Sequence, residues 1–159
     1  MKSARITYIA VLGALTVIFG YIESLFPLPI AIPGIKLGIS NIVILFALLK
    51  MKKSDAFFVL LIKVLVCALL FSGLNGLFYS FLGGVFGLLA MILALNFGLS
   101  EIGASMAGGV FHNIGQILAA SVMLGSMGAF YYLPVLLLSG LIVGGIVGVL
   151  CKLVISRLK

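Results

Sequence analysis

Residues 133–151 read LPVLLLSGLIVGGIVGVLC and contain no charged side chain. A helix that crosses the hydrocarbon core of a bilayer needs about 20 consecutive apolar residues. This stretch therefore predicts a transmembrane helix. Five further apolar runs precede it, at residues 6–26, 35–49, 56–72, 77–95 and 103–124.

The composition of the whole chain agrees with this pattern. Of its 159 residues, 64% are hydrophobic and 8% are charged, against about 25% charged residues in an average soluble domain. The run at 6–26 is longer than the core of a typical signal peptide, so we expect it to be a membrane helix. We therefore expect a single domain over residues 1–159, an all-α integral membrane protein folded as a six-transmembrane-helix bundle.

The distribution of Lys and Arg predicts the orientation of these spans. With a cytoplasmic N-terminus, eight of the ten basic residues fall on the inner side: Lys2, Arg5, Lys50, Lys52, Lys53, Lys152, Arg157 and Lys159. Lys36 falls on the outer side, and Lys63 falls within the third span. Because cytoplasmic connections are enriched in Lys and Arg, both termini are expected in the cytoplasm. The proline-rich segment 27–34 then faces outward, either as a loop folded over the domain or as a plain turn.

The acidic residues limit the chemistry that the chain can perform. Glu23, Asp55 and Glu101 are too widely spaced for a paired acid–base site or a magnesium-binding aspartate cluster. Both cysteines belong to apolar runs, which argues against a disulfide or metal framework. Ser54 and Asp55 stand where the third span begins, where a cap and a negative charge stabilise a helix. We therefore expect no enzyme and no metal site, and a structural role for Asp55.

Small residues at four-residue spacing predict helix faces that pack closely in a membrane. Such stripes are Gly140, Gly144 and Gly148 in the sixth span, Gly83 and Gly87 in the fourth, and Ala104, Gly108, Gly115 and Ala119 in the fifth. These stripes predict packing within the bundle. Ala10 and Ala14 form a similar stripe in the first span, near its cytoplasmic end, where helices of a partner could dock instead.

Polar side chains inside apolar runs are functional candidates, because burying them in a membrane is costly. His112 and Gln116 are four residues apart and share a helix face, with Asn113 beside them. These three side chains suit either a polar ligand or a hydrogen-bond network between helices, and a single histidine is too few ligands for zinc. Lys63 either reaches the inner interface by snorkelling or makes an internal charge pair or anion contact.

Further polar and aromatic side chains are expected at the outer helix ends. Glu23 lies near the end of the first span as a candidate partner for Lys36, and Asn41 lies one turn deeper than Lys36. Asn75 and Tyr79 follow a predicted loop at residues 72–74. This mixed polar and aromatic set is typical of a small-molecule pocket, here open to the outside.

Two stretches carry a specific resemblance to known proteins: PGIKLGISN at residues 33–41 and GASMAGGVFHNIGQ at residues 103–116. They resemble the Gx transporter family, which is also named heptaprenyl diphosphate synthase component I. The resemblance covers nearly the whole chain, including residues 132–134 before the sixth span. That family is in turn similar to the substrate-binding (S) components of energy-coupling factor (ECF) transporters.

The resemblance to S components implies six helices, cytoplasmic termini and an outward loop that covers the substrate, a position held here by residues 27–33. It also implies that Ala10 and Ala14, which match an Ala-xxx-Ala motif, contact the transmembrane T component. Cytoplasmic ATPases would drive the cycle. Because the chain has no GxxxxGK[ST] phosphate-binding loop, ATP would be hydrolysed by those partners, and we expect no cofactor in this chain.

Two functions are therefore predicted. The first is a membrane-embedded substrate-binding subunit of an ATP-driven transporter for a small polar or anionic molecule, in the bacterial plasma membrane. The alternative is a non-catalytic membrane accessory subunit in isoprenoid or quinone metabolism. We assign the net charge of +7 to membrane orientation and not to nucleic acid. The candidate substrate-binding residues are Glu23, Lys36, Asn41, Asn75, Tyr79, His112, Asn113 and Gln116.

Overall fold

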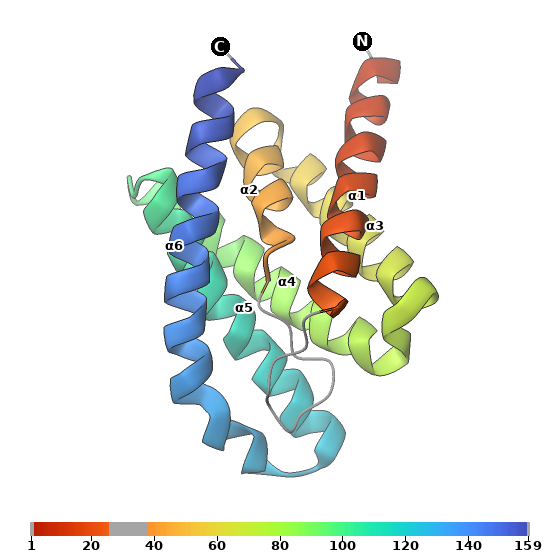
Figure 1. Ribbon diagram of the computed structural model, residues 1–159, viewed down its shortest axis with the longest axis vertical. Helices are drawn as coiled ribbons and strands as arrows, with labels where there is room; N and C mark the ends of the chain where they lie inside the picture. Colours follow the sequence, from red (N-terminus) through yellow and green to blue (C-terminus); the bar gives the residue numbers. More distant parts are fainter. Residues whose placement is uncertain (1, 26–37, 159) are drawn as a thin grey trace.

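The computed structural model describes residues 2–25 and 38–158, and the side chains from residue 3 onward in these ranges. Every regular element in these ranges is helical. In chain order they are α1 (Lys2–Leu25), α2 (Asn41–Lys50), α3 (Lys53–Cys67), the π-helical turn η1 (Ala68–Ser72), α4 (Gly73–Asn96), α5 (Glu101–Leu124), the 3₁₀ helix η2 (Met127–Tyr132) and α6 (Leu133–Arg157). Figure 1 shows their arrangement.

Four continuous helical segments are long and apolar enough to cross a membrane: Ser3–Leu25, Lys53–Asn96, Glu101–Leu124 and Met127–Arg157. Large apolar side chains such as Leu69, Val122 and Leu138 are exposed on the outside of the bundle. Exposed apolar surface on this scale is unfavourable in water and suits a lipid environment. The expected class, an all-helical protein with membrane-like helices, is therefore confirmed.

The structure corrects two predicted span boundaries. The third and fourth predicted spans form one continuous helical segment. A loop was predicted at residues 72–74. The chain instead turns a corner there through the π-helical turn η1 and Gly73, whose φ is +64°. The second helix begins at Asn41 and not at residue 35, after a turn over residues 39–40. Its 10 residues rise about 15 Å, half the thickness of a bilayer core. The proline-rich segment 27–34 lies outside the described residues.

Helix α5 packs between α4 and α6 through close backbone contacts. A Cβ atom added at Gly144 of α6 would lie 2.7 Å from the carbonyl oxygen of Ser105 in α5, and one added at Gly115 of α5 would lie 2.6 Å from the carbonyl oxygen of Leu82 in α4. Only glycine permits such an approach. The prediction that the glycine stripes of the fourth, fifth and sixth spans pack within the bundle is therefore confirmed.

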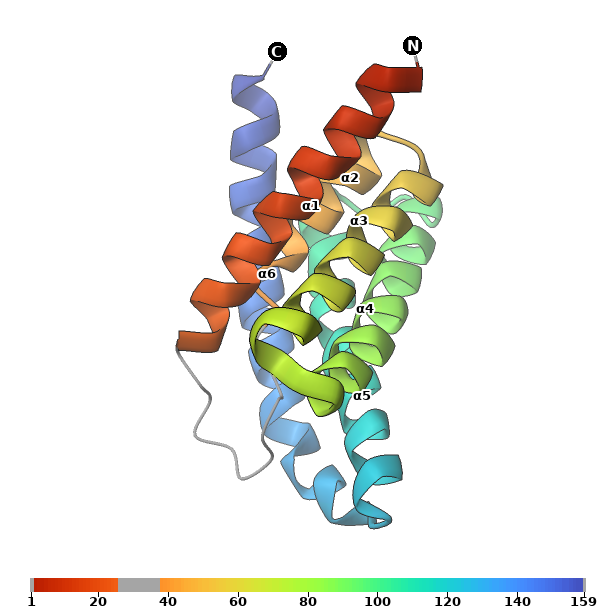
Figure 2. The ribbon, with the colours of Figure 1, turned by 90° about the vertical axis from the view of Figure 1, so that its right-hand side faces the viewer.

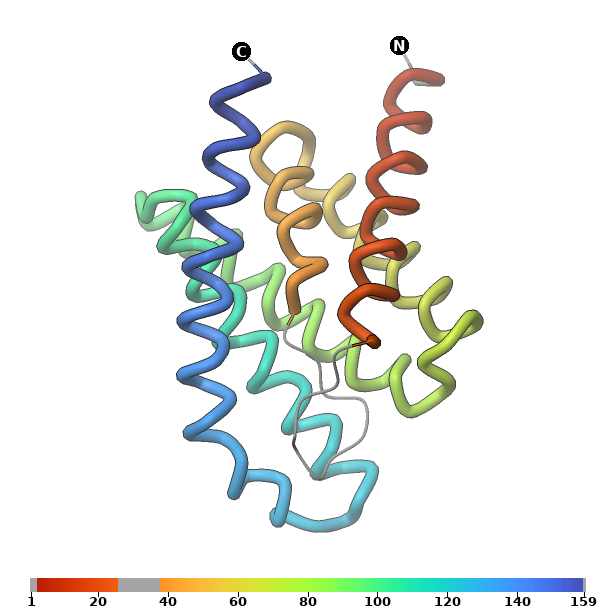
Figure 3. Tube along the Cα trace, in the orientation of Figure 1, coloured from red at the N-terminus to blue at the C-terminus, as the bar shows by residue number. Residues whose placement is uncertain are grey.

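The other three helices lie against this group. Helix α1 runs beside α3 (Figure 2), with Gly13 facing Ile62 and Gly20 facing the sulfur of Cys67. Helix α2 contributes Leu45 to an apolar core shared with Leu60 of α3 and other buried residues. The start of α1, the end of α6 and the junction of α2 with α3 lie at the same end of the molecule (Figure 3).

Candidate functional site

Six polar side chains come together around the start of α2, and we call them the polar cluster: Glu23, Ser40, Asn41, Lys63, His112 and Gln116. All six are buried. They belong to α1, the start of α2, α3 and α5, so residues far apart in the sequence converge at one place.

Glu23 joins the end of α1 to the start of α2. Its Oε1 accepts hydrogen bonds from the backbone N–H groups of Gly38 and Ile39, the latter at 3.1 Å, and its Oε2 accepts one from the Ser40 hydroxyl at 3.2 Å. A carboxylate that accepts several donors is stabilised when buried. Lys36, its predicted partner, lies outside the described residues.

Lys63 of α3 points into the bundle. Its side chain is only 4% exposed, and its Nζ donates to Oδ1 of Asn41 at 3.3 Å. The amine therefore does not snorkel to the interface; the internal charge pair or anion contact stays a prediction, because the partner seen here is an amide. An ionised amine inside an apolar bundle is costly unless hydrogen bonds offset its desolvation.

His112 and Gln116 of α5 face α4 where glycine leaves room for them. A Cβ atom added at Gly83 would lie 2.8 Å from Cγ of Gln116 and 3.1 Å from Cε1 of His112. One added at Gly38 would lie 3.4 Å from Cδ2 of His112, so the imidazole lies beside the start of α2. The prediction that these two side chains share an inward face is confirmed.

Asn113 makes its hydrogen bonds with α6. Its Nδ2 donates to the carbonyl oxygen of Leu136 at 2.6 Å and to the Ser139 hydroxyl at 3.4 Å, both in α6. Of the two predicted roles, the interhelical network is the one observed for this side chain. Asn113 therefore joins α5 to α6 and does not face the polar cluster.

Tyr79 and Asn75 of α4 were also predicted to bind substrate. Tyr79 is buried in a second apolar cluster that includes Ile117, Ala129 and Leu136. Asn75 is exposed near the start of α4. Tyr79 lies one helical turn from Gly83, which faces His112 and Gln116, so the assignment of Tyr79 and Asn75 to substrate binding stays a prediction.

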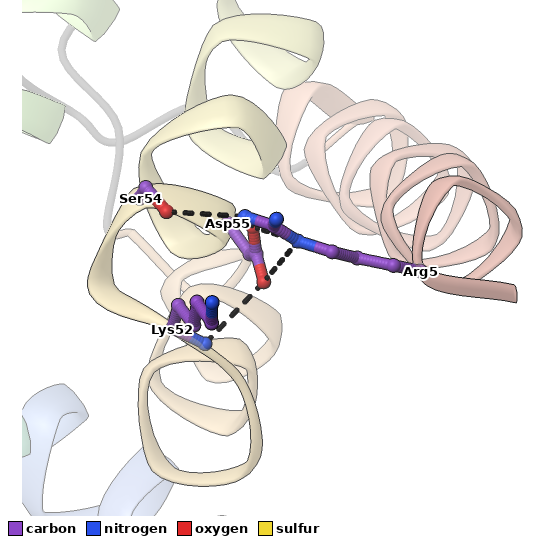
Figure 4. Close-up of polar contacts among 4 residues, drawn as sticks. All are labelled: Arg5, Lys52, Ser54 and Asp55. Carbon is purple, nitrogen blue, oxygen red and sulfur yellow. Dashed lines mark hydrogen bonds and ion pairs between the residues drawn. The ribbon is translucent and has the colours of Figure 1, made fainter. Parts of the chain in front are cut away.

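A contact that the sequence reasoning missed lies at the opposite end of α1 (Figure 4). The Nε of Arg5 donates to Oδ1 and Oδ2 of Asp55 at 2.9 and 3.1 Å. The terminal nitrogen Nη2 of Arg5 also pairs with Oδ1 of Asp55 and donates to the Ser54 hydroxyl at 3.3 Å. Asp55 also accepts from the backbone N–H of Lys52 at 3.4 Å, as a capping residue does. The predicted capping role of Asp55 is confirmed, and the same carboxylate ties α1 to α3.

Ala10 and Ala14 are exposed on α1, on a different face from Gly13, which meets α3. Neither alanine is used in packing among the described helices. Their assignment to partner docking stays a prediction.

The chemistry that the polar cluster offers is hydrogen bonding and charge. It contains one ammonium group, one carboxylate, one imidazole, two amides and one hydroxyl. Within the described residues, no three His, Cys, Asp or Glu side chains are close enough to hold a metal ion. The arrangement brings several directional hydrogen-bonding groups together inside an apolar bundle.

A comparison with known families gives one match. The family model described as heptaprenyl diphosphate synthase component I matches residues 12–154. No curated protein and no solved structure matches the chain. The matched region contains every member of the polar cluster.

Proposed function

We propose that this chain, which belongs to the heptaprenyl diphosphate synthase component I family, is the membrane-embedded substrate-binding subunit of an ECF-type ATP-driven transporter. Its substrate is a small polar or anionic molecule, and the polar cluster forms part of the binding site. The proposal includes six helices in the membrane, of which α2 with its 10 residues reaches only part of the way across, cytoplasmic termini and a place in the bacterial plasma membrane.

The observation that carries the proposal is the burial of Lys63 and Glu23 in one polar cluster inside an apolar bundle. Charged groups within membrane helices are costly and mark substrate or ion pathways. A few polar groups in apolar surroundings are typical of small-molecule sites. Structural contacts alone would not need an ammonium group here, because an apolar side chain of similar volume would fill the space without a desolvation cost.

The energy source is proposed to lie in partner subunits. The sequence has no phosphate-binding loop for ATP, and the exposed Ala10 and Ala14 offer a close-packing surface to the helices of a T component. We also propose that the chain is not itself an enzyme, because two of its three acidic side chains make contacts that hold the structure together. Glu23 holds the start of α2, and Asp55 holds Arg5.

The family description favours one second candidate, a non-catalytic membrane subunit that accompanies a prenyl diphosphate synthase. Synthases of that class bind diphosphate through magnesium and clustered aspartates, whereas this chain has a single aspartate. Under this candidate, catalysis belongs to another chain and the polar cluster serves packing only.

Purification with native partners separates the two candidates. Tagged full-length protein is extracted from its own membranes in mild detergent, and co-purified proteins are identified by mass spectrometry. A T component with ATPases is the expected result. Ala14→Trp should abolish this association because the ring blocks close approach, whereas Val122→Trp, at an exposed position of α5, should not. Association with a prenyl synthase alone would support the second candidate and overturn the first.

A binding experiment tests the polar cluster directly. Thermal unfolding of the purified chain is followed against a panel of small carboxylates, phosphates and neutral polar metabolites. A ligand at 100 times its Kd stabilises the folded state by about 2.7 kcal/mol. We expect at least one compound to stabilise the wild type and to lose its effect in Lys63→Met, while Ala14→Trp retains it. A panel without any stabilising compound, or equal stabilisation of Lys63→Met, would remove the binding role of the cluster.

A further inference from the structure

A groove between α1, α2 and α6 is separate from the polar cluster. It has a volume of about 340 Å³ and an apolar lining. Its lining includes Leu12 and Leu15 of α1, Ile42 and Phe46 of α2, and Val154 and Leu158 at the end of α6. We propose that this groove binds one anionic phospholipid of the bilayer, with an acyl chain in the groove and the headgroup at the end where α2 and α6 terminate.

The groove results from the difference in helix length. Helix α2 has 10 residues, whereas α1 has 24 and α6 has 25, so α2 rises about 15 Å against about 36 Å for its neighbours. Figure 1 shows α2 between α1 and α6, both of which extend past its end. The lining of α6 from Cys151 to Leu158 spans about 10 Å by helix rise, along which the part of an extended acyl chain nearest the headgroup can lie.

Two exposed cations stand at the end of this groove. Lys50 follows Ile42 and Phe46 at four-residue intervals, so it continues their face of α2 by one turn. Arg157 precedes the lining residue Leu158 in the last turn of α6. Arg5, at the same end, is engaged by Asp55, and Lys53 donates to Asn96, so we assign the phosphate contact to Lys50 and Arg157.

The combination of an apolar groove and adjacent cations determines the chemistry of the ligand. A hydrocarbon chain alone matches the lining, and a phosphate alone matches Lys50 and Arg157 through charge-assisted hydrogen bonds. An anionic phospholipid supplies both groups in one molecule, with its charged end at the membrane interface where such residues attract anionic lipids. This inference does not depend on the proposed transport function.

Native mass spectrometry tests the inference on the full chain in a mild neutral detergent. The protein is titrated with phosphatidylglycerol and with phosphatidylcholine that carry identical acyl chains. We expect one phosphatidylglycerol to bind per chain at about tenfold lower concentration than phosphatidylcholine, given the usual contribution of a basic residue near a membrane surface. Inorganic diphosphate, which has the charge without the chain, should not displace it.

Substitutions test the cations and the apolar groove separately. Lys50→Gln combined with Arg157→Gln should remove the preference for phosphatidylglycerol and leave phosphatidylcholine binding unchanged. Lys53→Gln is the matched control, because Lys53 is exposed at the same end of the molecule but donates to Oδ1 of Asn96 in α4, which does not line the groove. Leu15→Trp places a ring in the groove at a partly exposed position and should weaken binding of both lipids. Unfolding temperatures verify that each variant is folded.

Three results would overturn the inference. The first is equal binding of the two lipids by the wild type. The second is a loss of preference in Lys53→Gln as large as that in the double variant. The third is displacement of the lipid by inorganic diphosphate, which would indicate a site for free anions.

Discussion

The two halves of the molecule are held together by different kinds of contact. Helices α4, α5 and α6 approach through glycines, as at Gly144 of α6 against the backbone of Ser105. Helices α1, α2 and α3 share an apolar core and are tied in addition by polar side chains at separate points: Glu23 with residues 38–40, Lys63 with Asn41, and Arg5 with Asp55. The first kind of contact is spread along the helices, whereas the second is local.

This difference suggests that one half of the molecule is rigid and that the other half can shift. Closely packed backbones in a membrane lose many dispersion contacts when they separate, so the α4–α6 half forms a stable scaffold. The hydrogen bonds to a carboxylate can break and re-form one at a time as the helices shift. The polar cluster lies where the two halves meet, because α5 supplies His112 and Gln116 from the scaffold side.

The largest expected effect comes from breaking the scaffold. In Gly144→Val the new Cβ would begin 2.7 Å from the Ser105 carbonyl oxygen, which forces α5 and α6 apart. Overpacking usually costs about 1–3 kcal/mol, and we expect the upper end of that range because the obstacle is backbone. Thermal unfolding in detergent measures the loss.

Gly145→Val is the matched control in the same helix. A Cβ atom there meets only Cγ of Met106, at 3.9 Å, so stability should change little. Similar losses in the two variants would mean that the glycine contact between α5 and α6 does not hold the scaffold.

The second effect concerns the link between α1 and α2. Glu23→Ala removes the acceptor of two backbone N–H groups and of the Ser40 hydroxyl. Leaving buried donors unsatisfied costs about 1–3 kcal/mol. We expect faster hydrogen exchange at residues 38–43 and unchanged exchange in α5 and α6. Glu23→Gln keeps an acceptor and should show a smaller change; global loss of protection in Glu23→Ala would contradict a local role.

The smallest effect is expected at the other end of α1. Arg5 is 44% exposed in its side chain, and solvent weakens such ion pairs. Arg5→Gln and Asp55→Asn should each lower the unfolding temperature less than Glu23→Ala does. Their double-mutant cycle should show a coupling that decreases with added salt. A coupling independent of salt would show that the charges are not what joins the two residues.

Several features of the fold could be predicted from particular residues. The uninterrupted apolar run at 133–151 identified α6, and the four-residue glycine spacing identified the faces that pack on α5. The corner at Gly73 could not be predicted, because a glycine among apolar residues is equally typical of a loop. The start of α2 was placed too early, since Gly38 and Ser40 interrupt an apolar pattern that extends back to residue 35.

The site was predicted in part for a similar reason. His112 and Gln116 were assigned to one inward face because helix periodicity alone places them there. Asn113 and Tyr79 were grouped with them, but their partners on α6 and α5 are set by how the helices cross. The contacts of Glu23 with residues 38–40 and of Arg5 with Asp55 join positions 15 and 50 residues apart, and local patterns carry no signal for such pairs.

The sequence by itself determined the helical class, the membrane-like surface and the positions of the close-packing faces, because these depend on hydropathy and on the 3.6-residue period of each helix separately. The tertiary structure alone decided that Lys63 is buried on Asn41, that Glu23 holds the start of α2, and that a short α2 leaves an apolar groove. Each of these depends on the relative placement of two or more helices, which is set by packing across the whole bundle.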